Sequence, residues 1–326
     1  MESKNTVKMA NNLFMSIVLI SLCANIFVSL LSIKNISINI VVNLMASQMM
    51  IMVPGLIYYV CITKDGHPFK MYKKIKPLTV LLLIIFTWLI LPLVSATNVF
   101  SQLFTKNEVV SISGSVLELP IAPMIFIIGV FGPFCEEFVF RGLIYNSLKL
   151  RSERYIASGI VSALFFGLMH MNLNQFCYAF VLGIVFAFIN EILDSTWPSF
   201  ICHVVINTQN VLLLYMMNKL TSDTMGKTVS ELYNNEAATN IMTNKVATFI
   251  MFAVIFIVSI FTTTLAALLF YCIAHIEGKS EKIKLLLEKK DIKNKEKLIN
   301  IFGYVAITVC IFVMFVLEPI INLIKK

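Results

Sequence analysis

The stretch LTVLLLIIFTWLILPLVSA, residues 78–96, holds 19 consecutive positions without a charged side chain. A helix rises about 1.5 Å per residue, so a stretch of this length nearly crosses the roughly 30 Å hydrocarbon core of a bilayer. The whole chain has the same character: 58% of its 326 residues are hydrophobic and 13% are charged, and the mean hydropathy is +0.86. Soluble domains carry roughly 25% charge. The composition therefore predicts an all-α, polytopic membrane helix bundle, and it excludes a soluble enzyme, a disulfide scaffold and a disordered chain.

Apolar stretches of similar length recur along the chain and set its expected organisation. Because the fifth stretch is short, we expect eight or nine transmembrane helices. The stretches are residues 13–33, 40–62, 78–96, 121–148, 155–170, 175–192, 199–216, 246–275 and 298–317. We expect N-terminal transmembrane helices over 1–120, a catalytic core over 121–216, and C-terminal transmembrane helices with a Lys-rich loop over 217–326.

The distribution of Lys and Arg predicts the orientation. With nine spans, 18 of the 26 basic residues fall on the side of the N-terminus and 7 on the other side. The positive-inside rule then places the N-terminus in the cytosol of a multi-pass protein in a cell membrane. The basic residues lie between apolar runs, which is typical of loops facing anionic lipid, so membrane lipid is an expected partner and nucleic acid is not. The segment 279–297 is interpreted as a solvated basic loop. The alternative is an extension of the eighth helix into the cytosol, with Ile283, Leu285, Leu286 and Leu287 resting at the membrane interface.

The fourth span contains charged residues that an ordinary membrane helix would avoid: Glu136, Glu137 and Arg141. Each charge at the bilayer centre costs about 2.5–3.5 kcal/mol on insertion scales. Glu137 and Arg141 are four residues apart, so we expect them to pair along one helical face in a supporting role. Glu136 lies about 100° further around the helix and remains free. A structural ion pair needs one carboxylate, so the second one indicates chemistry.

Two of the four histidines also fall in predicted spans. His170 ends the fifth span, and His203 precedes Asn207 by four residues, which places both on one helical face. A single intramembrane histidine is usually a hydrogen-bonding partner between helices. Two histidines, an asparagine and a free glutamate together favour a functional site.

These residues form three ordered patterns: EExxxR at 136–141, FxxxH at 166–170 and HxxxN at 203–207. Together they resemble the motifs of the CPBP family, the CAAX prenyl endopeptidase and bacteriocin-processing (Abi) intramembrane proteases. The similarity extends over about a quarter of the chain. It implies that Glu136 and His170 activate water, and that His203 and Asn207 form the oxyanion site.

The side-chain chemistry agrees with these roles. A carboxylate beside an imidazole can activate water, and N–H donors one helical turn apart can stabilise a tetrahedral oxyanion. No cofactor is then required. The alternative is a zinc site with Glu136, His170 and His203 as ligands and an open fourth position. No HExxH pattern is present, which favours the metal-independent mechanism.

The predicted function is therefore an intramembrane endopeptidase that acts on a membrane-associated peptide or protein. The abundance of Ile, Lys and Asn indicates an AT-rich, bacterial source, for which a leader peptide or the tail of a membrane protein is the expected substrate. A non-catalytic immunity or scaffold protein of the same family is the alternative. A proton-coupled transporter ranks third, because the chain shows no inverted repeat.

Overall fold

The structure is a computed structural model in which residues 6–34, 36, 38–64, 73–105, 107, 113–152, 154–229, 231, 244–288, 297–317 and 320 are described. The described residues are helical, with short connections and no strand among them. The helices are α1 (Thr6–Ile33), α2 (Ile40–Lys64), α3 (Pro77–Ser101), α5 (Ser113–Leu117), α6 (Ile121–Met124), η2 (Ile125–Phe131), α7 (Gly132–Glu137), η3 (Phe138–Tyr145), α8 (Asn146–Ser152), α9 (Tyr155–Met169), α10 (Leu173–Leu193), α11 (Trp197–Met225), α14 (Lys245–Ile276), α15 (Ser280–Leu287), α16 (Ile301–Phe312) and η4 (Val313–Leu317).

The predicted fold class is confirmed. In the described part of the chain, seven helices are long and apolar enough to cross a membrane, and two shorter apolar helices, Tyr155–Met169 and Ile301–Leu317, correspond to the fifth and ninth predicted spans. The helix ends differ from the hydropathy limits: the first helix begins at Thr6 and the seventh span continues to Met225. Polar turns continue these helices because backbone hydrogen bonding does not end where hydrophobicity does. The chain is a multi-pass membrane protein.

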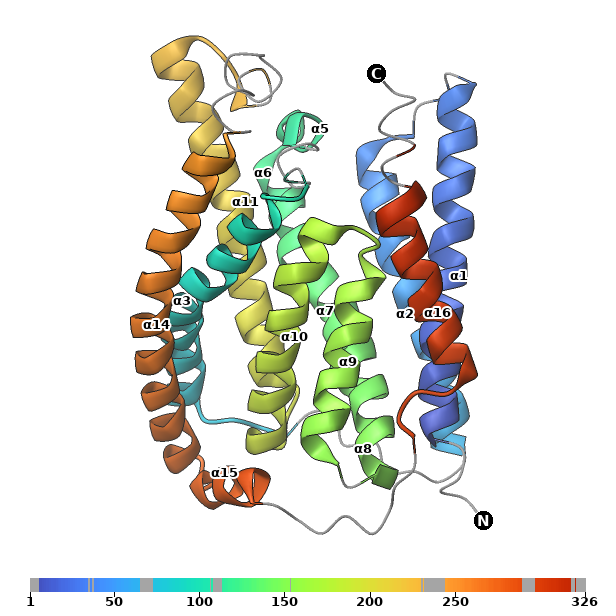
Figure 1. The fold of residues 1–326 in the computed structure, drawn as a ribbon, viewed down its shortest axis with the longest axis vertical. Helices are drawn as coiled ribbons and strands as arrows, with labels where there is room; N and C mark the ends of the chain where they lie inside the picture. Colours follow the sequence, from blue (N-terminus) through green and yellow to red (C-terminus); the bar gives the residue numbers. More distant parts are fainter. Residues whose placement is uncertain are drawn as a thin grey trace.

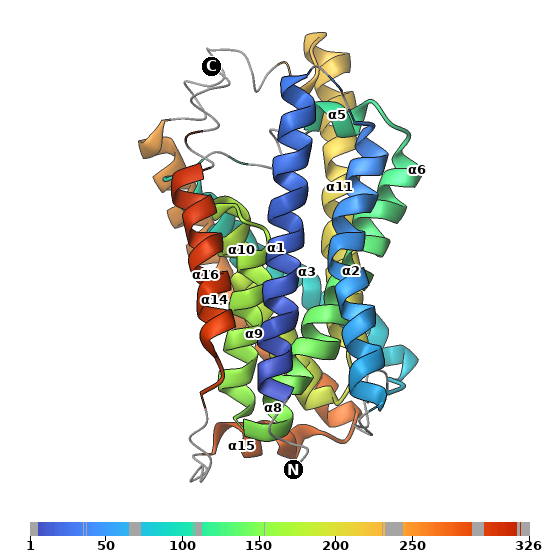
Figure 2. The ribbon, with the colours of Figure 1, turned by 90° about the vertical axis from the view of Figure 1, so that its right-hand side faces the viewer.

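One interrupted helix, which runs from α6 through η2, α7 and η3 to α8, forms the centre of the bundle. Helices α9, α10 and α11 pack on one side of it, and α1 and α2 pack on the other. Helices α3 and α14 lie along each other outside α10 and α11, and α16 lies against α1 and α9 (Figures 1 and 2). Only 11% of the most apolar window of α14 is buried, whereas 61% of the corresponding window of the central helix is buried. The outer helices therefore present apolar faces suited to lipid, and the central helix is shielded from it.

The Lys-rich segment differs from its prediction as a solvated loop. Gly278 has a φ of +68°, a conformation that glycine adopts without strain, and the chain turns there into α15. Ile283 and Leu286 of this helix pack against the core formed by α3, α10, α11 and α14. Figure 1 shows α15 across the end of the bundle where α1 begins. Residues 289–296 of the segment lie outside the described residues.

Ion pairs attach α15 to the connection between α10 and α11. The Nζ of Lys279 lies 2.8 Å from Oδ2 of Asp194, and the Nζ of Lys282 donates to Oδ1 of Asp194 and to the carbonyl of Glu191. Burial raises the pKa of Asp194, but its hydrogen bonds to Lys279 and Lys282 and their positive charges outweigh this effect and lower the pKa to about 2. The connection is thus held inside the protein, and α15 covers it.

Candidate active site

The central helix departs from regular α-helical geometry on both sides of the two glutamates, where η2 and η3 are π-helical. At the end of η2 the Gly132 N–H donates to the carbonyl of Ile127, five residues earlier. The next donor in that register would be residue 133, but it is a proline and has no N–H. The carbonyl of Ile128 instead accepts a 3.1 Å hydrogen bond from Nδ2 of Asn207. Asn207 therefore connects α11 to the widened helix; such π segments are frequent at functional sites.

Glu137 connects the central helix to α11 at a second point. Its Oε1 accepts a 3.0 Å hydrogen bond from Nη1 of Arg141 and also lies 3.0 Å from Nδ1 of His203. The side chains of Glu137 and Arg141 are 3% and 0% exposed. The predicted ion pair between residues four apart is thus confirmed, while the contact with His203 was not predicted. Because Glu137 holds one ring nitrogen of His203, it determines which way the other nitrogen points.

The guanidinium of Arg141 lies against aromatic rings. Its central carbon is 4.1 Å from the ring centre of Phe166 and 5.3 Å from that of Phe186. Its Nε and Nη2 have no hydrogen-bond partner among the described residues, and neither has Oε2 of Glu137. The cation is therefore held by one carboxylate oxygen and by the ring faces, which makes the charge expensive to leave unpaired.

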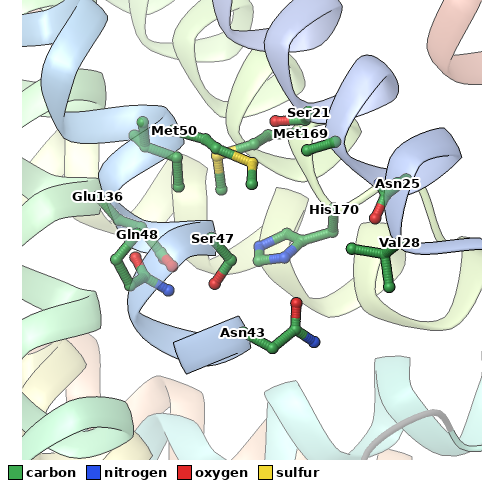
Figure 3. Close-up of a pocket in the computed structure, with 12 residues that line it drawn as sticks. Ser21, Asn25, Val28, Asn43, Ser47, Gln48, Met50, Glu136, Met169 and His170 are labelled. Carbon is green, nitrogen blue, oxygen red and sulfur yellow. The ribbon is translucent and has the colours of Figure 1, made fainter. Parts of the chain in front are cut away.

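Glu136 faces a cavity of about 180 Å³ that His170 also lines. The residue is 7% exposed, and its Oε2 lies 3.7 Å from Nε2 of His203. Figure 3 shows the Glu136 side chain and the His170 ring beside the same space. A single water molecule needs roughly 10–15 Å³ of such volume, so the cavity can hold several water molecules. The arrangement places a carboxylate and an imidazole in the lining of one cavity.

His170 lies at the corner between α9 and α10. It ends α9, and the next residue, Met171, has a φ of +49°, which is uncommon for a residue with a side chain. The two helices approach closely because position 183 is a glycine: a Cβ there would lie 2.8 Å from the Cα of Ala163. The sharp corner and the close packing fix the position of the imidazole at the cavity wall.

The structure brings most of the predicted site residues together and leaves one of them apart. Glu136, Glu137, Arg141 and His203 form a continuous series of contacts. Of these four, only Glu136 lines the cavity, which it shares with His170. Asn207 lies one turn further along α11, bonded to the central helix, and does not line the cavity.

The same geometry bears on the alternative zinc site. Within the described ranges, no three His, Cys, Asp or Glu side chains are placed so that they could hold a metal ion. The three alternative ligands, Glu136, His170 and His203, do not form a ready ligand set in this arrangement. The two mechanisms differ in a measurable way, because only the zinc-dependent one requires a bound ion for activity.

Residues of α1 and α2 that sequence reasoning missed complete the cavity. Its other wall carries polar side chains from these two helices: Ser21, Asn25, Asn43, Ser47 and Gln48. A sequence signal was available, because Ser21 and Asn25, like Asn43 and Ser47, are spaced four residues apart in otherwise apolar spans. The pattern of one span could not show that this polar face meets Glu136.

The fold and the site define a polytopic helical membrane protein with a buried glutamate–histidine centre. Residues 118–209, which contain all three motifs, match the family model described as "Type II CAAX prenyl endopeptidase Rce1-like". The predicted resemblance to the CPBP family is thereby confirmed for this segment.

A curated relative matches over part of the same chain. It is the protein of Bacillus subtilis (strain 168) named "Putative membrane peptidase YdiL", which is 29% identical over 90 residues. The match covers 28% of this chain and 36% of the relative, so it extends over about a third of that protein. No solved structure matches the chain.

Proposed function

We propose that this protein is an intramembrane endopeptidase that hydrolyses a peptide bond in a membrane-associated peptide or protein. The observation that carries the proposal is the shared cavity: Glu136 and His170 face one buried space, and His203 is held beside Glu136 by Glu137. A buried carboxylate pair with two histidines is costly in a membrane protein, so its presence supports chemistry over a scaffold role.

In the proposed reaction, Glu136 and His170 hold a water molecule in the cavity. Glu136 accepts a proton from the water molecule while the water oxygen bonds to the carbonyl carbon of the substrate. When the carbon–nitrogen bond breaks, the same proton passes to the leaving amine nitrogen. One carboxyl group thus serves first as general base and then as general acid, and no metal ion is needed to complete the proton transfers.

The oxyanion would be stabilised from α11. Nδ1 of His203 is 3.0 Å from the Glu137 carboxylate and donates to it, so Nε2 can donate to an oxyanion only when the ring carries both protons. Asn207 uses one N–H for the carbonyl of Ile128 and keeps a second N–H. In this scheme Glu137 positions His203, and the π-helical carbonyl positions Asn207.

The environment of the reaction is part of the proposal. We place the protein in a bacterial plasma membrane, with lipid around its outer helices. Its N-terminus would lie in the cytosol, because the excess of basic residues is on that side. A leader peptide or the tail of a membrane protein would be the substrate. The name of the B. subtilis relative, "Putative membrane peptidase YdiL", supports a peptidase activity in a membrane and does not specify the substrate.

The test is hydrolysis of a quenched fluorogenic peptide library by the purified full-length protein in lipid nanodiscs. Wild type should cleave members of the library with and without a chelator, and Glu136→Gln should be correctly inserted but inactive. Cleavage by Glu136→Gln at the wild-type rate would refute the assignment. Loss of wild-type activity in chelator, restored by zinc, would replace the proposed mechanism by the zinc-dependent one.

A further inference from the structure

One wall of the cavity comes from helices outside the matched segment 118–209. Four of its side chains, Asn25 on α1 and Asn43, Ser47 and Gln48 on α2, are here called the amide wall. Figure 3 shows Asn43 and Ser47 beside the His170 ring and Gln48 beside Glu136. The amide wall therefore borders the space in which the proposed hydrolysis takes place.

Part of the hydrogen-bonding capacity of the amide wall is unused. Asn25, Asn43 and Ser47 are exposed, and no side-chain hydrogen bond joins Asn25 or Asn43 to another described residue. The side chain of Gln48 bonds to Glu136, and its Oε1 is buried without a partner among the described residues. Ser47 donates to the carbonyl of Leu44, which leaves its oxygen free to accept. Unpartnered polar groups within membrane-spanning helices are unfavourable unless something else binds to them.

We propose that the amide wall is the subsite that binds the main chain of the substrate beside the scissile bond. This inference rests on the proposed peptidase function and specifies what its site recognises. A peptide must be locally extended to be cleaved, and its N–H and C=O groups then lose their helical partners. Inside a membrane these groups need replacements. Side-chain amides offer both a donor and an acceptor, which matches a peptide group.

The charge of the cavity narrows the class of substrate. Among the described residues that line it, Glu136 is the only acid and no Lys or Arg is present. The described lining thus offers no Lys or Arg to bind a terminal carboxylate, and the Glu136 carboxylate disfavours a negative charge beside it. The substrate segment is therefore an internal one, with uncharged residues on both sides of the scissile bond and recognition through its main chain.

The experiment uses the peptide that wild type cleaves best, with the full-length protein in nanodiscs. Asn25→Leu and Asn43→Leu should each raise KM at least tenfold while kcat stays within about threefold. Asn12→Leu is the matched control: the same substitution on α1, at an exposed position outside the cavity, which should leave both constants unchanged. Unchanged KM in both cavity variants, with wild type active and Glu136→Gln inactive, would overturn the subsite and leave the peptidase function intact.

A second comparison tests recognition of the main chain itself. Peptides methylated on one backbone nitrogen near the scissile bond lose one donor, so wild type should cleave at least one of them with a KM raised severalfold. In Asn43→Leu that penalty should disappear, because its acceptor is gone. If Asn43→Leu does not fold, Asn43→Ala takes its place. A methylation penalty of equal size in wild type and variant would refute main-chain binding. Efficient cleavage of peptides with Asp or Glu beside the bond would refute the requirement for uncharged residues there.

Discussion

Arg141→Ala tests whether the buried ion pair is mainly structural. The variant leaves the Glu137 carboxylate, 3% exposed, with His203 as its remaining partner. Removing one member of a buried pair typically destabilises the fold by about 3–5 kcal/mol, and the lost contact with Phe166 adds about 1–2 kcal/mol. The remaining contact between His203 and Glu137 offsets part of this total. At about 2–4 °C per kcal/mol, the melting temperature should fall by on the order of 10 °C. Thermal unfolding in nanodiscs, followed by intrinsic fluorescence, measures the change.

The matched control is Arg154→Ala, at the half-exposed start of α9, which should shift the melting temperature by no more than about 2–4 °C. In the double variant Glu137→Gln/Arg141→Met both charges are gone, so most of the lost stability should return. Activity should not return, because the neutral amide introduced at position 137 does not hold His203 as the carboxylate does. An Arg141→Ala protein as stable as wild type but inactive would refute the reasoning and place Arg141 in the chemistry.

Three further predictions concern residues on and around α11. Asn207→Ala should lower kcat roughly 10²–10³-fold with little change in KM, because an oxyanion donor acts mainly in the transition state. A raised KM with an unchanged kcat would contradict that role. His203→Gln keeps an N–H donor and should retain more activity than His203→Ala. If metal analysis finds zinc bound to wild type but not to His203→Gln, the zinc alternative is established. Asp194 has a pKa lowered to about 2 by Lys279 and Lys282, so its stabilising contribution is complete above about pH 4 and is lost as the pH falls through about 2. The melting temperature of wild type should therefore fall more steeply over that range than that of Asp194→Asn, and parallel curves would count against the ion pairs.

The motif residues show what a helical period can predict. Glu137 and Arg141 pair as their spacing of four residues requires, because that spacing places two side chains on one face whatever surrounds the helix. His203 and Asn207 share a helix for the same reason. Their partners could not be read from spacing: His203 contacts Glu137 on another helix, and Asn207 bonds to a carbonyl that is free because Pro133 follows a π-helical turn.

The short helix α15 illustrates a different limit. The segment 279–297 has the composition of a solvated loop, yet Ser280–Leu287 is helical, because Ile283 and Leu286 find apolar partners and Lys282 finds acidic ones. Local composition does not reveal such partners, since they lie in other helices of the bundle and in the connection that follows α10.

The sequence by itself determined the membrane-spanning helical class, because apolar runs of about 20 residues have few alternatives in a bilayer, where every backbone polar group must be satisfied within the helix. It also determined which residues are too costly in a membrane to be there without a role. Only the tertiary structure decided what these residues contact. The cavity between Glu136, His170 and the polar faces of α1 and α2 depends on packing between segments more than 80 residues apart, and no periodicity within one segment specifies that packing.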